Sequence, residues 1–180
     1  MVPACLITGL PGADKQGFVA ALAAARPHGA SWALLDNDGG GSAQALAGEG
    51  IATGVVSGCA CCSGRITLQV GLVQLLRRVR PGFLIITADG AAEPEALEQT
   101  LRQPELARAI TVIRRICVVP PQWLAALPAT ARERLQRQAA AADGVVAATA
   151  ESVLQLRTAG YPAAAGYAEM IPQIVTGVPA

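Results

Sequence analysis

The stretch Pro3-Ala-Cys-Leu-Ile-Thr8, followed by Gly9-Leu-Pro-Gly-Ala-Asp-Lys-Gln16, decides how this chain folds. The first six residues form a short apolar run, which is typical of a strand buried on both faces of a parallel sheet. The next eight contain two glycines and the only lysine of the chain, Lys15, and an alanine-rich segment at 17–25 predicts a helix after them. A strand, a glycine loop and a helix in this order are the surroundings that a phosphate-binding loop requires. We therefore predict such a loop at residues 9–16.

The loop departs from the usual phosphate-loop pattern G-x-x-x-x-G-K-[ST] at two positions. Asp14 stands where the second glycine is expected, and Gln16 stands where a hydroxyl residue is expected to hold magnesium. A carboxylate about 4 Å from a phosphate charge is repelled by roughly 4 kcal/mol at an effective dielectric constant of 20. The residues of the loop that we predict to contact a nucleotide are Gly9, Gly12, Asp14, Lys15 and Gln16.

The rest of the chain alternates short apolar runs with segments of helical periodicity. Strands are predicted at 31–35, 51–56, 83–86, 109–119 and 144–148, and helices at 42–48, 66–79, 94–101, 130–142 and 151–159; the tail from Gly160 has no predicted element. This alternation predicts an α/β, P-loop NTPase-like fold of three layers, with a mostly parallel central sheet flanked by helices. At this length, residues 1–180 are expected to form a single domain.

Four segments of this predicted fold follow strands and should meet on one rim of the sheet. They are residues 9–16, 37–41, the segment after 56 and 87–94. Ligands of parallel α/β sheets bind beyond the carboxyl ends of the strands. The rim is therefore the expected place of the functional site.

Three of the five cysteines fall within four positions, in Ser57-Gly58-Cys59-Ala60-Cys61-Cys62-Ser63-Gly64. Thiolates on a glycine-bordered loop are natural ligands of zinc and other soft metals, so Cys59, Cys61 and Cys62 are predicted metal ligands. No second cysteine pair is present, so the fourth ligand would be water, a partner or another part of the chain. A redox or structural role of these thiols stays open. The other two cysteines, Cys5 and Cys117, lie in apolar runs and are predicted to be buried in the core.

Charge and composition exclude several classes of function. The formal net charge is +1, so no electrostatic partner such as nucleic acid or a membrane surface is indicated. No apolar run approaches the ~18 residues that span a bilayer, and the first residues show no basic segment of a signal peptide. An odd number of unevenly spaced cysteines indicates a reducing compartment, so a cytoplasmic location is predicted.

Taken together, these motifs resemble the CobW/HypB/UreG family of metal-centre GTPases, and its CobW branch most, over roughly residues 3–156. The most specific parts are Gly58-Cys59-Ala60-Cys61-Cys62 and Ile85-Ile86-Thr87-Ala88-Asp89-Gly90-Ala91-Ala92-Glu93-Pro94. The resemblance implies that the cysteines bind zinc or a related transition metal, with cobalt, nickel and Cu(I) also open. It implies that GTP and magnesium control delivery of the metal to a client metalloenzyme. The family usually carries a further C-terminal domain, which we expect to be absent here or supplied by a separate partner subunit; self-association stays open.

Two further departures concern the nucleotide. Thr87 takes the place of the acidic residue that the family has at the end of the third core strand, and Asp89 is the nearest substitute. Where the family has its guanine-binding N-K-x-D, after Ala142–Val146, this chain has Ala147-Ala148-Thr149-Ala150-Glu151. With Asp14 and Gln16, four nucleotide-handling features are altered, whereas the cysteine motif is intact.

Three hypotheses follow. The first is a CobW-like metal-binding protein, acting as a metallochaperone, sensor or accessory protein, with weak or lost GTPase activity. The second is an active nucleoside triphosphatase with a non-standard loop, in which Lys15 holds phosphates and Asp89 or Asp38 holds magnesium. The third is a thiol redox or structural protein on the same fold. The single histidine, His28, is predicted to be exposed in a loop, and Trp32 and Trp123 are predicted to be packing residues.

Overall fold

A computed structural model describes residues 1–58, 64–119 and 126–178 of the chain. Within these residues the centre of the molecule is a seven-stranded sheet of order β3-β2-β4-β1-β5-β6-β7. The strands are β1 (Val2–Thr8), β2 (Trp32–Asp36), β3 (Ala52–Val55), β4 (Phe83–Thr87), β5 (Ile110–Val118), β6 (Gly144–Ala147) and β7 (Ala165–Gly166). Each of the described strand pairs is parallel. The α/β fold predicted from the sequence is confirmed.

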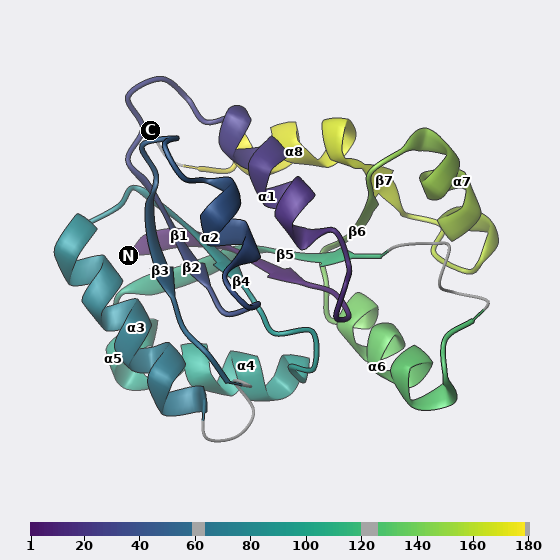
Figure 1. Cartoon of the computed structure of the whole chain (residues 1–180), viewed down its shortest axis with the longest axis horizontal. Coiled ribbons are helices and arrows are strands. Elements are labelled where there is room, and N and C mark those ends of the chain that lie inside the picture. The colour runs from purple at the N-terminus through teal and green to yellow at the C-terminus, as the bar shows by residue number, and fades with distance from the viewer. Residues whose placement is uncertain (59–63, 120–125, 179–180) are drawn as a thin grey trace.

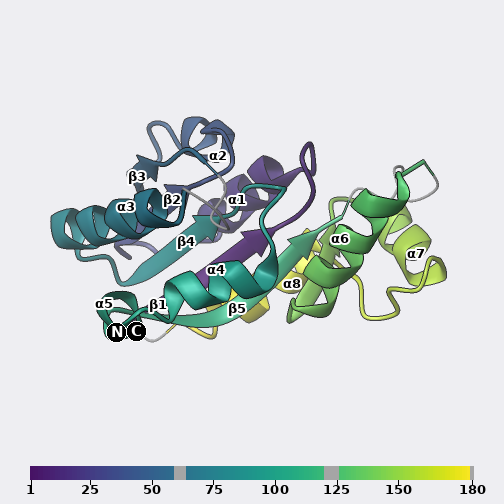
Figure 2. The same cartoon turned by 90° about the horizontal axis from the view of Figure 1, so that it is seen from below.

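Helices cover both faces of the sheet, which gives three layers (Figures 1 and 2). They are α1 (Lys15–Ala24), α2 (Gly41–Ala45), α3 (Gly64–Val79), α4 (Pro94–Leu101), α5 (Pro104–Ala107), α6 (Ala129–Ala140), α7 (Ala150–Thr158) and α8 (Tyr167–Val175). Side chains of α1 and α8 pack with Cys5 and Ile7 on one face. Those of α3, α4 and α5 pack with Ala4 and Leu6 on the other. Alternate residues of β1 point to opposite faces, as a strand requires.

The sequence missed β7, α5 and α8. The tail after Gly160 is rich in glycine and proline, and α8 contains Pro172 within the helix. Proline normally interrupts a helix. Here the buried side chains of Met170, Ile171 and Ile174 pack α8 against the sheet, and this tertiary burial outweighs the local preference.

An irregularity in β5 explains the two arginines that interrupt its apolar pattern. Ala4 pairs with Val112 but the next residue, Cys5, pairs with Arg114, so Ile113 is extra in the ladder. Such a bulge redirects the following side chains. The guanidinium of Arg115 then lies 3.0 Å from the carboxylate of Glu98.

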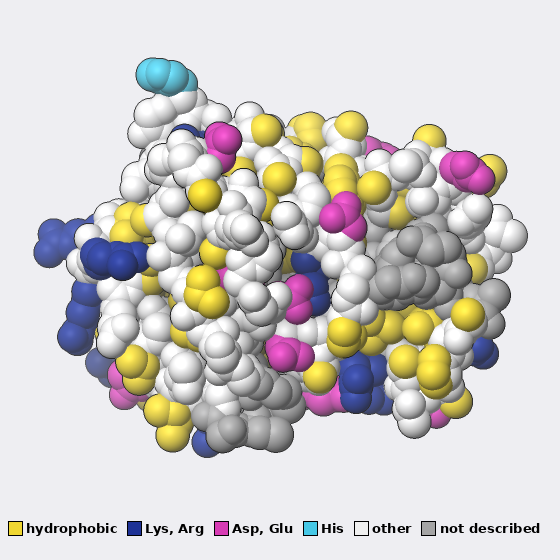
Figure 3. Space-filling model, in the orientation of Figure 1, with side chains coloured by type: hydrophobic (Ala, Val, Ile, Leu, Met, Phe, Trp, Pro, Cys, Tyr) yellow, Lys and Arg dark blue, Asp and Glu magenta, His cyan; other side chains and the backbone are white. Residues whose placement is uncertain are grey.

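Most residues that we predicted to be structural have that role. The thiols of Cys5 and Cys117 are fully buried, and Trp32 packs against Phe83 with ring centroids 4.7 Å apart. His28 is exposed and projects at one corner of the face in Figure 3. Trp123 lies outside the described residues. No helix in the described part of the chain is long and apolar enough to span a bilayer.

Candidate functional site

The site is built where β1, β2 and β4 end. The loop of residues 9–14 joins β1 to α1, the turn of residues 37–40 follows β2, and residues 88–90 follow β4. Gly9 has a φ of 149°, and a Cβ at this position would lie 2.6 Å from the carbonyl oxygen of Val118. Only glycine therefore allows the loop to leave β1 so close to β5.

Lys15 lies at the centre of this rim, and its side chain is fully buried. The Nζ atom donates to the carbonyl oxygens of Gly9 at 2.8 Å and Ala88 at 3.3 Å. It also lies 3.0 Å from Oδ1 of Asp38. An ammonium group has three hydrogens, and these three acceptors satisfy all of them.

Asp36 holds the turn that carries Asp38. The Asp36 side chain is fully buried, and its Oδ1 accepts from the Asp38 backbone N–H at 2.8 Å and from the Thr87 hydroxyl at 3.0 Å. Its Oδ2 accepts from the Ala43 backbone N–H at 2.8 Å. Bonds to an ionised acceptor are the strong ones. The sequence analysis did not single out Asp36; its position directly at the end of a buried strand was the available signal.

Asp38 is the half-buried partner of Lys15. Burial raises the pKa of Asp38 above its ordinary value, the Lys15 ammonium opposes this, and the carboxylates of Asp36 and Asp89 raise the pKa further. Asp89 follows the end of β4 and so lies on the same rim. Its own Oδ1 accepts from the Ala91 backbone N–H at 2.7 Å and so stabilises the turn after β4.

Asp14, which replaces a glycine of the usual loop, caps α1. Its Oδ1 accepts from the backbone N–H of Gly17 at 2.9 Å, which is the usual role of an aspartate at a helix N-cap. The hydroxyl of Tyr167, in α8, donates to the carbonyl oxygen of Asp14 at 3.1 Å. The N-terminus of a helix is also where phosphate groups bind, so the carboxylate lies where the loop would hold an anion. Gln16 is exposed on the first turn of α1.

The turn after β2 is also tied to the chain that leads into the cysteines. Asn37 is buried, and its Nδ2 donates to the carbonyl oxygens of Val56 at 3.2 Å and Gly58 at 2.9 Å. The predicted ligands Cys59, Cys61 and Cys62 lie outside the described residues. Within the described residues no group of three or more His, Cys, Asp or Glu side chains is placed to hold a metal ion.

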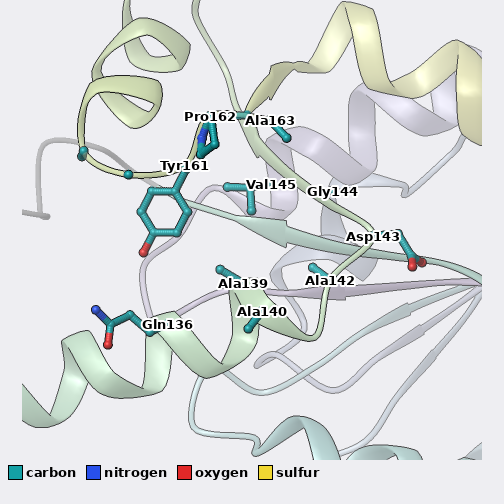
Figure 4. A pocket seen from close by; sticks show the side chains of 13 residues that line it. Gln136, Ala139, Ala140, Ala142, Asp143, Gly144, Val145, Tyr161, Pro162 and Ala163 are labelled. Carbon is teal, nitrogen blue, oxygen red and sulfur yellow. The ribbon is translucent and has the colours of Figure 1, made fainter.

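Two larger cavities lie away from Lys15. One of about 500 Å³ lies between α7 and α8, and its lining includes Ala148 and Ala150 from the segment that replaces the guanine-binding motif. In that segment the Thr149 hydroxyl accepts from the Ser152 backbone N–H at 3.1 Å and caps α7. The other cavity, of about 530 Å³, lies at the amino end of β6 and is walled largely by alanines, with Tyr161 at one side (Figure 4).

Comparisons with known proteins identify the family of the chain. Residues 3–159 match the nucleotide-binding domain of the CobW/HypB/UreG family. The zinc chaperone YeiR of Escherichia coli (strain K12) is 32% identical over 147 residues, which make up 79% of this chain and 44% of that protein. The chain thus spans less than half the length of this curated relative.

Solved structures show the likeness of fold. The Zn(II)-bound YjiA GTPase from E. coli superposes with a TM-score of 0.53 at 16% identity, over 96% of this chain and 54% of that one. The signal recognition particle receptor FtsY from Elizabethkingia anophelis does so with a TM-score of 0.61 at 11% identity, over 89% of this chain and 55% of that one. The fold is that of P-loop GTPases. By the match of its sequence over most of its length, the chain belongs to the CobW/HypB/UreG family.

Proposed function

We propose that this chain handles zinc as a cargo, binding it through Cys59, Cys61 and Cys62 for delivery to a client metalloenzyme, with weak or lost GTPase activity. The intact Gly-Cys-x-Cys-Cys motif within the family match supports this, as does the similarity to a protein named a zinc chaperone. The observation that carries the proposal is the pair of bonds from Asn37 to Val56 and Gly58. They hold the residue before Cys59 next to the turn whose Asp38 pairs with Lys15.

Three thiolates suit a cargo site better than a permanent one. Zinc in proteins takes four ligands, and structural sites supply all four from the protein. Three cysteines leave one position for water or for a group of the client, through which the metal can be passed on. Cobalt, nickel and Cu(I) also accept thiolates. The identity of the bound metal therefore has to be measured by elemental analysis.

The altered residues of the phosphate loop support the proposal of weak or lost GTPase activity. Asp14 and Asp38 place two carboxylates beside the phosphate loop, and Thr87, in place of an acid, is bonded to Asp36. Phosphate charges would be repelled there. Magnesium would lack the usual hydroxyl and carboxylate ligands.

Equilibrium dialysis with zinc tests the metal site. The wild-type chain should bind about one zinc ion per chain, and Cys61→Ser should weaken zinc binding by at least roughly tenfold. Cys5→Ala is the matched control, because it also leaves four thiols but removes one that is fully buried in the core. Zinc binding that is equal in the wild-type chain and Cys61→Ser would contradict the proposal, and a disulfide within the cysteine motif would favour the thiol hypothesis.

An active nucleoside triphosphatase is the second candidate. The preserved β1–loop–α1 unit with Lys15 in the loop favours it. This hypothesis expects GTP hydrolysis that is lost in Lys15→Ala. Equal phosphate release from both proteins would exclude it, and would agree with lost GTPase activity.

A further inference from the structure

The contacts of Lys15 bear on how the phosphate loop could be regulated. We propose that Asp38 closes this loop from within, because it takes the position at the Lys15 ammonium group that a phosphate would need. The inference rests on the nucleotide side of the proposed function and is independent of zinc binding. A triphosphate then binds only in the fraction of molecules in which the Asp38 side chain has moved away from Lys15.

The first step is the number of acceptors around Nζ. Two of the three are backbone carbonyls, of Gly9 and Ala88, which belong to the loop and to the end of β4. Asp38 supplies the third, at 3.0 Å, and among the described residues it is the only charged acceptor of Nζ. Lys15 therefore has no hydrogen left to donate to a phosphate unless one of these partners leaves.

The second step is which partner is able to leave. The Asp38 side chain is 26% exposed whereas that of Lys15 is fully buried. Two glycines follow it, Gly39 and Gly40, with φ values of 81° and 85°, and a Cβ added to Gly39 would meet no atom within 4 Å. Asp38 thus lies on a turn with open space beside Gly39, so its side chain can leave Lys15 while the backbone bond of Asp38 to Asp36 is kept.

The third step is the anion position at the start of α1. The carboxylate of Asp14 caps this helix, so the ammonium and the helix N-terminus are each already paired with a carboxylate of the chain itself. Apparent affinity falls by the fraction of molecules that are competent to bind. Removing the charge of Asp38 should raise that fraction.

Calorimetry with inorganic tripolyphosphate and with GTP, each with magnesium, tests the proposal on the full chain. Asp38→Asn should bind tripolyphosphate at least roughly tenfold more tightly than the wild-type chain. Glu49→Gln is the matched control, because it also removes one negative charge, from an exposed side chain outside the rim. In the double variant Lys15→Ala/Asp38→Asn the gain should disappear.

Three outcomes overturn the proposal. One is equal tripolyphosphate binding by the wild-type chain, Asp38→Asn and Asp38→Ala, each shown to be folded by circular dichroism. The second is an equal gain in Glu49→Gln, which would mean that general charge and not the Lys15 contact decides. The third is a gain that persists without Lys15. Zinc dialysis on the same samples separates the two proposals, since loss of zinc binding alone contradicts only the cargo function.

Discussion

Thr87 stands where the family has an acidic residue, and its side chain forms a hydrogen bond with Asp36 on the neighbouring strand. The Thr87 hydroxyl donates to the buried Oδ1 of Asp36 at 3.0 Å. A carboxylate at position 87 would bring two like charges together in a buried site, where they repel. The threonine instead donates a hydrogen bond to Asp36 and so supports the turn that holds Asp38.

Replacing this hydroxyl tests the interaction. Thr87→Val keeps the shape of the side chain and should lower the free energy of unfolding by about 2 kcal/mol, since hydrogen bonds to charged groups contribute that much. Urea denaturation measures the change. Thr100→Val is the control, because Thr100 is equally buried but bonds the neutral carbonyl of Ala96. An equal or smaller cost at position 87 would mean that Asp36 does not depend on Thr87.

The two core thiols make stability depend on alkaline pH. Burial raises the pKa of both Cys5 and Cys117 from 9.0 to about 12. In the unfolded chain these thiols lose their protons first, so the free energy of unfolding should fall as pH rises above 9 and continue to fall until about 12. The full difference corresponds to roughly 4 kcal/mol for each thiol.

Urea denaturation across this pH range checks the expectation. Cys5→Ala should lose less stability between neutral and alkaline pH than the wild-type chain, because one of the two titrating thiols is gone. An identical pH dependence of the two proteins would contradict it. In the folded protein neither thiol should react with iodoacetamide near neutral pH.

At the scale of elements, the turn after β2 connects two loops that are far apart in the sequence. Asn37 bonds the end of the β3 segment, and the adjacent Asp38 pairs with Lys15 at the start of α1. Neighbouring residues of one turn thus contact the chain up to Gly58, which precedes the predicted cysteine site, and the phosphate loop.

The variant Asn37→Asp tests whether the turn after β2 supports zinc binding. A carboxylate has the same size but cannot donate to the carbonyls of Val56 and Gly58, and it would repel both. We expect zinc binding to weaken by roughly tenfold, the effect of losing about 1.4 kcal/mol. Gln44→Glu, which adds the same charge on the exposed face of α2 and keeps both bonds of Asn37, should bind zinc as the wild-type chain does. Unchanged zinc affinity in a folded Asn37→Asp would separate this turn from metal binding.

For the molecule as a whole, α8 ties the C-terminal part of the chain to the phosphate loop. The rings of Tyr167 and Phe18 meet edge to face with centroids 4.9 Å apart, and the Tyr167 hydroxyl bonds Asp14. Burial and the nearby Asp14 raise the pKa of Tyr167 well above its ordinary value. The first and last helices of the described chain therefore support one loop.

Tyr167→Phe keeps the ring and removes only the hydroxyl. The free energy of unfolding should fall by about 1 kcal/mol, the usual contribution of one hydrogen bond. Tyr161→Phe is the comparison, because no hydrogen bond of its hydroxyl is found among the described residues, and it should change stability less. Equal unfolding midpoints for Tyr167→Phe and the wild-type chain would show that the packing of α8 is sufficient without the bond.

The local patterns of the sequence determined the α/β class, the phosphate loop, most strands and helices, and the burial of Cys5 and Cys117. These features follow from apolar runs, helical periodicity and glycine positions, which act over a few residues. They also indicated the family, through the motifs around Lys15, the cysteines and Asp89.

Only the tertiary structure decided what the charged residues of the rim do. It pairs Lys15 with Asp38, Asp36 with Thr87 and Asp14 with Tyr167, and it forms α8 despite Pro172. No local sequence pattern predicts these partners. Lys15 and Asp38, like Asp36 and Thr87, meet because their strands end on the same rim of the sheet, and Asp14 meets Tyr167 because α8 packs against the sheet. Distances of this kind arise when the sheet assembles, and the charge balance of the phosphate loop is decided at that step.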